Sequence, residues 1–318
     1  MKKYELTDEY IEIGLVTKIK LYRIKALVTI ASIGVGAGDL GGYVEKESNL
    51  DQSGNAWVYG NAKVYGNAWV YGNARVFDDA WVYGNARVFD DAEVCGNARV
   101  FDDAKVFDDA WVYGNARVFD DAEVCGNARV FDDAKVFDDA EVCGNARVFD
   151  DAKVYGNAWV YGNARVFDDA EVCGNARVFD DARVFDDAEV CGNAEVYGNA
   201  WVYGNAKVYG NAEVCGNARV FDDAEVYGNA EVYGNAEVCG NAKVCERSDI
   251  VWFSNIGTEC GTLTVFKTKQ GVLWVTRGCF SGSVEEFLKK SAEVHDEKTK
   301  REYQLLIEVA KSRLEETQ

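Results

Sequence analysis

The stretch ARVFDDAKVFDDAWVYGNARVFDDAEVCGNARV (residues 98–130) repeats a six-residue unit. Ala occupies every sixth position from Ala56 to Ala242 and Val every sixth from Val58 to Val244, giving 32 consecutive hexapeptides without an insertion. Ala and Val lie two residues apart, so in an extended segment both side chains point to one face and the intervening positions point to the other. Each unit therefore predicts a strand of about four residues with Ala and Val inward.

Each unit ends in Gly-Asn or Asp-Asp, except the last one, in which Glu246 and Arg247 follow Cys245. These residue types tolerate left-handed backbone angles and turn the chain sharply. Three strands and three corners predict a triangular coil of 18 residues, whose strands pair in parallel with the next coil; the 32 units make about 11 coils. The chain contains no Pro, which fits a backbone whose amide hydrogens serve such ladders.

The pattern V-[YFC]-[GD]-[ND]-A-x, from Ala56 to Cys245, resembles the hexapeptide repeat of left-handed parallel β-helix proteins. Left-handedness is implied by this resemblance alone, because parallel crossovers are ordinarily right-handed. The residue after the aliphatic is aromatic or Cys here, whereas the family often has Gly, Ala or an acid. We expect an all-β solenoid, a left-handed parallel β-helix, with a small α+β cap at its C-terminal end.

Three segments are predicted: an N-terminal β cap at 1–55, the repeat at 56–245 and a ββ/αα module at 246–318. Solenoid ends expose strand edges that must be covered. KIKLYRIKALVTI (18–30) predicts one or two strands, and GDLGGYVEKESNL (38–50) leads into the first coil. In the C-terminal module, strands are predicted at 249–256, 262–268 and 272–276.

Two helices are predicted to end the chain. Ser283 and Glu286 form a capping-box pattern, and Tyr303, Leu306, Ala310 and Leu314 have helical spacing. The flanking sequences also resemble uncharacterised hexapeptide-repeat proteins of bacteria and bacteriophages, which implies no known activity.

Most of the formal net charge of -20 resides in the repeat, where residues 56–245 hold 34 acids against 16 bases. Such a surface repels phosphates, so we expect no direct nucleic acid binding. The start of the chain lacks a signal-peptide pattern, and the apolar stretch from Ala26 to Gly38 is too short for a bilayer. We therefore expect a cytoplasmic protein with no membrane association.

The outward residues of one unit vary together. All 12 units that end in Phe-Asp-Asp have Arg or Lys directly before the Val, and seven of the eight Cys units have Glu there. An Arg or Lys near each Asp pair is expected to offset part of its repulsion. With an 18-residue coil, one face collects a strip of aromatic residues and Arg, which we call the predicted strip: Trp111, Tyr113, Arg129, Phe131, Arg147, Phe149, Arg165, Phe167, Arg183, Phe185, Trp201 and Tyr203.

Two interpretations of the predicted strip remain open. It could bind a protein, a glycan or another copy of the chain, because aromatic and Arg side chains supply contact area and directional bonds. Alternatively, its ladders could only stabilise neighbouring strands. The Asp corners are expected to be solvated rather than Ca²⁺-loaded, since no calcium-loop spacing accompanies them.

Cysteines are expected to be free thiols in a reducing compartment, although Cys125 with Cys143 and Cys173 with Cys191 fall in register on adjacent coils. Many hexapeptide β-helix enzymes are acyltransferases with a His base, and a related branch binds zinc through several His. This chain has a single His, His295, outside the coils. We expect no catalytic residue, metal or cofactor. The preferred function is a repeat scaffold that binds a partner; the alternatives are an acyltransferase-like enzyme and an acidic nucleic-acid mimic.

Overall fold

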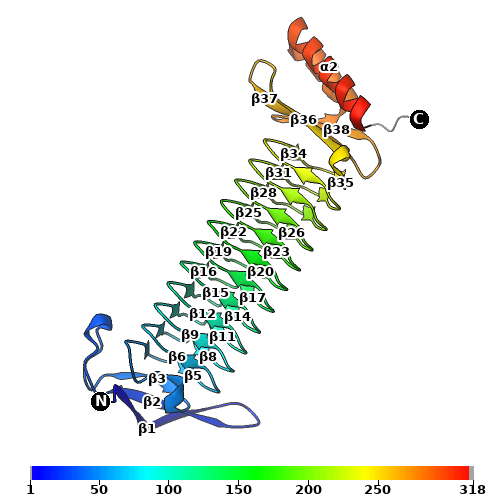
Figure 1. The fold of residues 1–318 in the computed structure, drawn as a ribbon. Coiled ribbons are helices and arrows are strands. Elements are labelled where there is room, and N and C mark those ends of the chain that lie inside the picture. The colour runs from blue at the N-terminus through cyan, green and yellow to red at the C-terminus, as the bar shows by residue number, and fades with distance from the viewer. Residues whose placement is uncertain (1, 315–318) are drawn as a thin grey trace. The chain divides into compact units, whose positions relative to one another are not determined.

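The computed structural model describes residues 2–314. The chain divides into two compact units, Met1–Asp168 and Asp169–Gln318. Each unit contains a parallel β-solenoid in which a strand pairs with the strands 18 residues before and after it (Figure 1). The predicted parallel β-solenoid and its coil length of 18 residues are confirmed.

The first unit opens with the antiparallel strands β1 (Tyr4–Ile13) and β2 (Ile19–Ala26), followed by β3 (Leu40–Val44). The coils follow, each strand comprising a Val and the residue before it. Every third strand joins the same sheet, so three sheets form: β5 (Lys63–Val64) to β20 (Lys153–Val154), β4 (Trp57–Val58) to β22 (Arg165–Val166), and β6 (Trp69–Val70) to β21 (Trp159–Val160). β3 pairs with β5 and so attaches the N-terminal strands to the first of these sheets.

The second unit continues the same pattern in three sheets, and then changes to an antiparallel sheet and two helices. The coil strands run from β23 (Glu171–Val172) to β35 (Lys243–Val244), from β24 (Arg177–Val178) to β33 (Glu231–Val232), and from β25 (Arg183–Val184) to β34 (Glu237–Val238). The antiparallel sheet contains β36 (Ile250–Ile256), β37 (Gly261–Lys267), β38 (Leu273–Arg277) and β39 (Phe280–Ser283). The helices are α1 (Val284–Val294) and α2 (Glu297–Leu314).

Each coil strand has two residues, so the predicted length of four is wrong. The corner starts directly after the aromatic position, where a positive φ ends the extended segment. Hydrogen bonding between coils nevertheless continues into the corner. On one coil the N–H groups of Arg99, Phe101 and Asp103 donate to carbonyls of the next coil at 2.9, 3.0 and 2.9 Å.

The interior consists of the repeated Ala and Val side chains. Every repeat Ala and Val from Ala56 to Val244 is fully buried, as the spacing predicts. Burial of each Val contributes about 1.5 kcal/mol before the entropy cost of ordering the chain. Most outward positions lie outside this interior and can vary; Trp57, which is 1% exposed and packs against the Tyr4 ring, is an exception.

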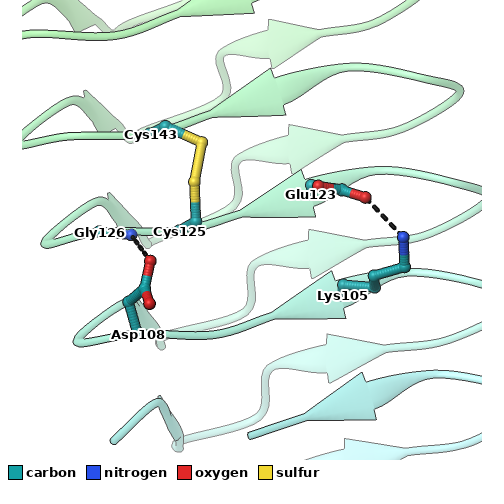
Figure 2. The surroundings of a disulfide bond; sticks show 6 residues. All are labelled: Lys105, Asp108, Glu123, Cys125, Gly126 and Cys143. Carbon is teal, nitrogen blue, oxygen red and sulfur yellow. Dashed lines mark hydrogen bonds and ion pairs between the residues drawn. A yellow bond between two sulfur atoms is a disulfide. The ribbon is translucent and has the colours of Figure 1, made fainter. Parts of the chain in front are cut away.

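The corners are built on left-handed residues. The first Asp of all twelve Asp-Asp corners has a positive φ, between 55° and 59°. Gly takes the same position in the other corners. The Asp carboxylate can serve the next coil as well, because Asp108 Oδ2 accepts a hydrogen bond from the Gly126 N–H at 3.1 Å (Figure 2).

Polar side chains cover the strand edges at the end of the coils in each unit. In the first unit, the buried Lys3 Nζ donates to the Ala56 carbonyl and Asn49 Nδ2 donates to the Ala68 carbonyl, both at 2.8 Å. In the second unit, Thr276 Oγ1 donates to the Glu237 carbonyl at 2.7 Å, and the Glu237 N–H donates to Thr264 Oγ1 at 3.1 Å.

The C-terminal elements agree with the sequence in part. β36, β37 and β38 fall on the three predicted strands, and the Ser283 side chain accepts from the Glu286 N–H at the start of α1. Tyr303, Ala310 and Leu314 are buried on α2. β39 and β1 were missed by the sequence reasoning, because neither has an apolar run framed by turn residues.

Candidate functional site

In the first unit, the Arg residues of the predicted strip form one exposed column. Arg129, Arg147 and Arg165 occupy equivalent positions on consecutive strands of the β4–β22 sheet. None of the three makes an ion pair with a residue in the described part of the chain. Trp111 heads the column, 40% exposed, and the Arg129 guanidinium lies 5.3 Å from its ring centroid. These side chains are available to a partner.

The aromatic column of the predicted strip is a stacked ladder. Ring centroids are 4.8 Å apart for Tyr113–Phe131 and Phe131–Phe149 and 4.9 Å for Phe149–Phe167, and the rings are within 2° of parallel. The ring faces cover one another and the side chains are half-buried. Stacking of this kind stabilises neighbouring strands, so only the ring edges remain for a partner.

The part of the predicted strip in the second unit has a similar chemistry. The Arg183 guanidinium lies 4.9 Å from the Trp201 ring centroid, and Arg219 approaches the same ring at 5.1 Å. Phe185 and Tyr203 stack at 4.9 Å. Trp201 and Arg183 are only partly exposed, so this part offers less free surface than the Arg column of the first unit.

The β5–β20 sheet carries a second set of unpaired cations, which the sequence reasoning did not single out. Arg99, Arg117 and Lys135 are in register on β11 (Arg99–Val100), β14 (Arg117–Val118) and β17 (Lys135–Val136). We call these three residues the cationic column. The 18-residue spacing in the sequence already places these three residues in one column.

Several cations elsewhere on the coils pair with a Glu one coil away. Lys105 Nζ lies 2.6 Å from Glu123 Oε1 in the first unit (Figure 2), and Lys207 Nζ lies 2.7 Å from Glu189 Oε1 in the second. Arg117 and Lys135 make no ion pair with any Asp of the described chain. The partial offset of the Asp repulsion by a nearby Arg or Lys stays a prediction at these two residues.

At one Asp corner, neighbouring carboxylates repel each other. Desolvation and the neighbouring Asp120 and Asp103 carboxylates raise the pKa of Asp102. Over residues 2–314, no group of three or more His, Cys, Asp or Glu side chains is placed to hold a metal ion. Neither helix of the described chain is long and apolar enough to cross a bilayer.

Four cysteines form disulfides, so the expectation of free thiols is wrong for them. Cys125 is bonded to Cys143 in the first unit (Figure 2) and Cys173 to Cys191 in the second. In-register stacking brings the Cα atoms of each pair to 4.6 Å, within the range that a disulfide spans. Each bond therefore links two adjacent coils.

The single His of the sequence, His295, lies at the end of a helix and beside a Tyr ring. His295 caps the C-terminal end of α1 and its ring lies 5.4 Å from that of Tyr303. A hollow of about 340 Å³ in the second unit is lined by Glu231, Tyr233, Arg247, Ile250, Val251, Trp252 and Arg313, and His295 does not line it. The residues that line this hollow therefore do not place a Ser, Thr or Cys nucleophile next to a His base.

Comparison with known families adds one finding. The model of the YdcK Beta solenoid repeat matches residues 68–83. This stretch resembles that repeat. It spans β6, β7 (Arg75–Val76) and β8 (Trp81–Val82), which are consecutive strands of one coil in the first unit. No curated protein matches the chain. The match supports a β-solenoid repeat protein and names neither a substrate nor a partner.

Proposed function

We propose that the protein is a non-catalytic repeat scaffold that binds a protein, a glycan or another copy of itself along the predicted strip. The observation that carries this proposal is the column of Arg129, Arg147 and Arg165, three exposed cations in register without an ion pair. Arg in such an arrangement supplies repeated bidentate donors, and the adjacent ladder supplies apolar ring edges.

The repeat architecture suits this role. Ala and Val alone fill the coils, so the outward columns can change without loss of the core. We also propose that the coils are left-handed and belong with the hexapeptide-repeat β-helices, on the basis of the sequence resemblance.

The test is a comparison of two charge variants of the full chain. The strip variant carries Arg129→Glu, Arg147→Glu and Arg165→Glu. The matched control carries the same change of charge on exposed helical positions, at Lys289, Lys298 and Arg301. Both are probed for binding to a glycan array, to immobilised proteins and to the wild-type chain, with far-ultraviolet circular dichroism to confirm folding.

We expect the strip variant to lose at least about tenfold in affinity for the partner, as loss of several charge-assisted bonds implies, while the control retains it. Because aromatic contacts contribute, binding should persist in moderate salt. Equal binding by both variants, for every probe that the wild type binds, would contradict the proposal.

A further inference from the structure

We infer that the β5–β20 sheet of the first unit is a self-association surface, whose partner is the same sheet in a second copy of this chain. The inference goes beyond the proposed function, because it concerns a different sheet from the one that carries the predicted strip. It is carried by the cationic column and the residues beside it, all of which lie within the first unit.

Three consecutive rows of this sheet have the same order of side chains along the strand. Each row presents a cation, then a Phe, then an exposed Asp at the corner. The rows are Arg99-Phe101-Asp103, Arg117-Phe119-Asp121 and Lys135-Phe137-Asp139. The cation and the Asp each lie two residues from the Phe, so the pattern places opposite charges on either side of an aromatic ladder.

This pattern is complementary to itself under one twofold rotation. An axis along the aromatic ladder, parallel to the direction in which coils stack, reverses the strands of the second copy and keeps each row opposite its own counterpart. Each cation then faces an Asp of the partner, and the two aromatic ladders face each other. An axis along the strands would instead set the cationic columns against each other. The charges therefore select coils that run in the same direction in both copies.

All three rows can match at once. Phe101, Phe119 and Phe137 stack at 4.9 Å with rings within 3° of parallel, and the second copy has the same spacing. If one row of the first copy lies opposite its counterpart in the second copy, the next rows are therefore aligned as well. A partner with a different fold would not have this matching spacing. The ring faces are already covered within each ladder, so the copies would meet through ring edges.

The charged groups are available for this contact. Arg117, Lys135, Asp121 and Asp139 make no ion pair with a described residue of their own chain. The outer row is less free, because Arg99 lies over the Trp81 ring at 5.6 Å and Asp103 accepts a hydrogen bond from Asn85 Nδ2 at 3.1 Å. Exposed ion pairs are individually weak and screened by salt, so we expect a weak dimer that salt dissociates.

A charge-exchange experiment on the full chain tests this arrangement. One variant carries Arg99→Glu, Arg117→Glu and Lys135→Glu, and the other carries Asp103→Lys, Asp121→Lys and Asp139→Lys. Sedimentation velocity is measured for the wild type, for each variant and for their equimolar mixture, at low and at high salt. Circular dichroism checks that each variant folds.

We expect a wild-type dimer whose association weakens by at least about tenfold from low to high salt. Each variant alone should be monomeric, because like charges face each other across the axis. The mixture should form a heterodimer, because Glu of one variant then faces Lys of the other, and Asp faces Arg or Lys. Restoration in the mixture also shows that neither variant failed merely by misfolding.

Other outcomes overturn the inference. A wild type that is monomeric at low salt, variants that still dimerise alone, or a mixture that stays monomeric would each do so. Loss of the dimer in the Arg129, Arg147 and Arg165 strip variant, with the cationic-column variant unaffected, would move self-association to the predicted strip. That result, like a monomeric wild type that still binds another partner through the strip, leaves the proposed function standing.

Discussion

The twelve left-handed Asp residues explain why two corner sequences alternate through the repeat. Gly adopts a positive φ at no steric cost, and Asp does so more readily than other side chains. Asp can adopt the positive φ and also provides a carboxylate. At Asp108 this carboxylate accepts a hydrogen bond from the neighbouring coil. Gly-Asn and Asp-Asp are thus interchangeable for the backbone, and they differ in the charge they place on the surface.

A substitution series at Asp132 tests this account, since this residue has a φ of 56° and its side chain makes no hydrogen bond to another residue of the described range 2–314. We expect Asp132→Val to lower the free energy of unfolding by about 1–2 kcal/mol, because a β-branched residue is strained at this φ. Asp132→Gly should be at least as stable as the wild type. Thermal unfolding by circular dichroism measures both, and a Val variant as stable as the Gly variant would refute the left-handed assignment.

The paired cysteines give a second prediction at the residue scale. Without reductant, the denatured chain should alkylate at the six free cysteines Cys95, Cys215, Cys239, Cys245, Cys260 and Cys279, and with reductant at all 10. Mass spectrometry counts the adducts. Reduction should lower the free energy of unfolding by about 3 kcal/mol for each 18-residue loop. Ten adducts without reductant would contradict the disulfides.

At the element scale, a similar short turn stands beside the coils in each unit. The sequences Lys46-Glu-Ser-Asn-Leu and Glu246-Arg-Ser-Asp-Ile both form a 3₁₀ turn, at Glu47–Asn49 and Arg247–Asp249. The Asn49 and Asp249 side chains accept from the backbone N–H three residues earlier at 2.9 and 3.0 Å. The first turn lies between β3 and the first coil strand, β4, and the second lies between the last coil strand, β35, and β36.

Asp249 also fastens the antiparallel sheet to the last coil. Burial acts to raise its pKa, but hydrogen bonds from the Cys245 thiol, the Lys267 ammonium and the Cys245 and Glu246 N–H groups lower it to about 2. The Lys267 ammonium lies 2.7 Å from Asp249 Oδ1.

Because the folded pKa of Asp249 lies below the unfolded value, its stabilisation is complete above about pH 4 and is lost as the pH falls toward 2. We expect Asp249→Asn to lower stability at neutral pH by about 2 kcal/mol. The variant should also show a smaller loss of stability between about pH 4 and 2. The helical circular dichroism signal reports the C-terminal elements during unfolding. Glu293→Gln, which removes the same charge at an exposed site, is the control; an equal effect would argue against the Asp249 contacts.

At the scale of the whole molecule, the excess of acids governs behaviour in solution. The formal net charge is -20 and the pI is about 4.5. Self-repulsion of this size keeps copies apart at neutral pH, so any association must rely on local complementarity.

We therefore expect non-specific association to rise as the pH falls from 7 toward about 4.5, where the net charge vanishes. Static light scattering across this range measures the change. Salt should reduce the specific dimer at pH 7 but not the association near the pI, which separates the two effects. Constant scattering over the whole range would contradict this view.

The sequence by itself determined the coil, because Ala and Val at an unbroken interval of six admit one inward face and fix which residues share a column. It also predicted the Ser283 cap and the helical spacing of Tyr303, Ala310 and Leu314 on α2, which depend on local spacing. Only the tertiary structure decided the two-residue strand length, the stacking of the rings and the closure of Cys125 with Cys143, because these depend on corner geometry and on distances between coils. The same holds for the cations. Their number follows from the composition, but the packing of neighbouring coils decided that Lys105 pairs with Glu123, while Arg117 and Lys135 make no ion pair within residues 2–314.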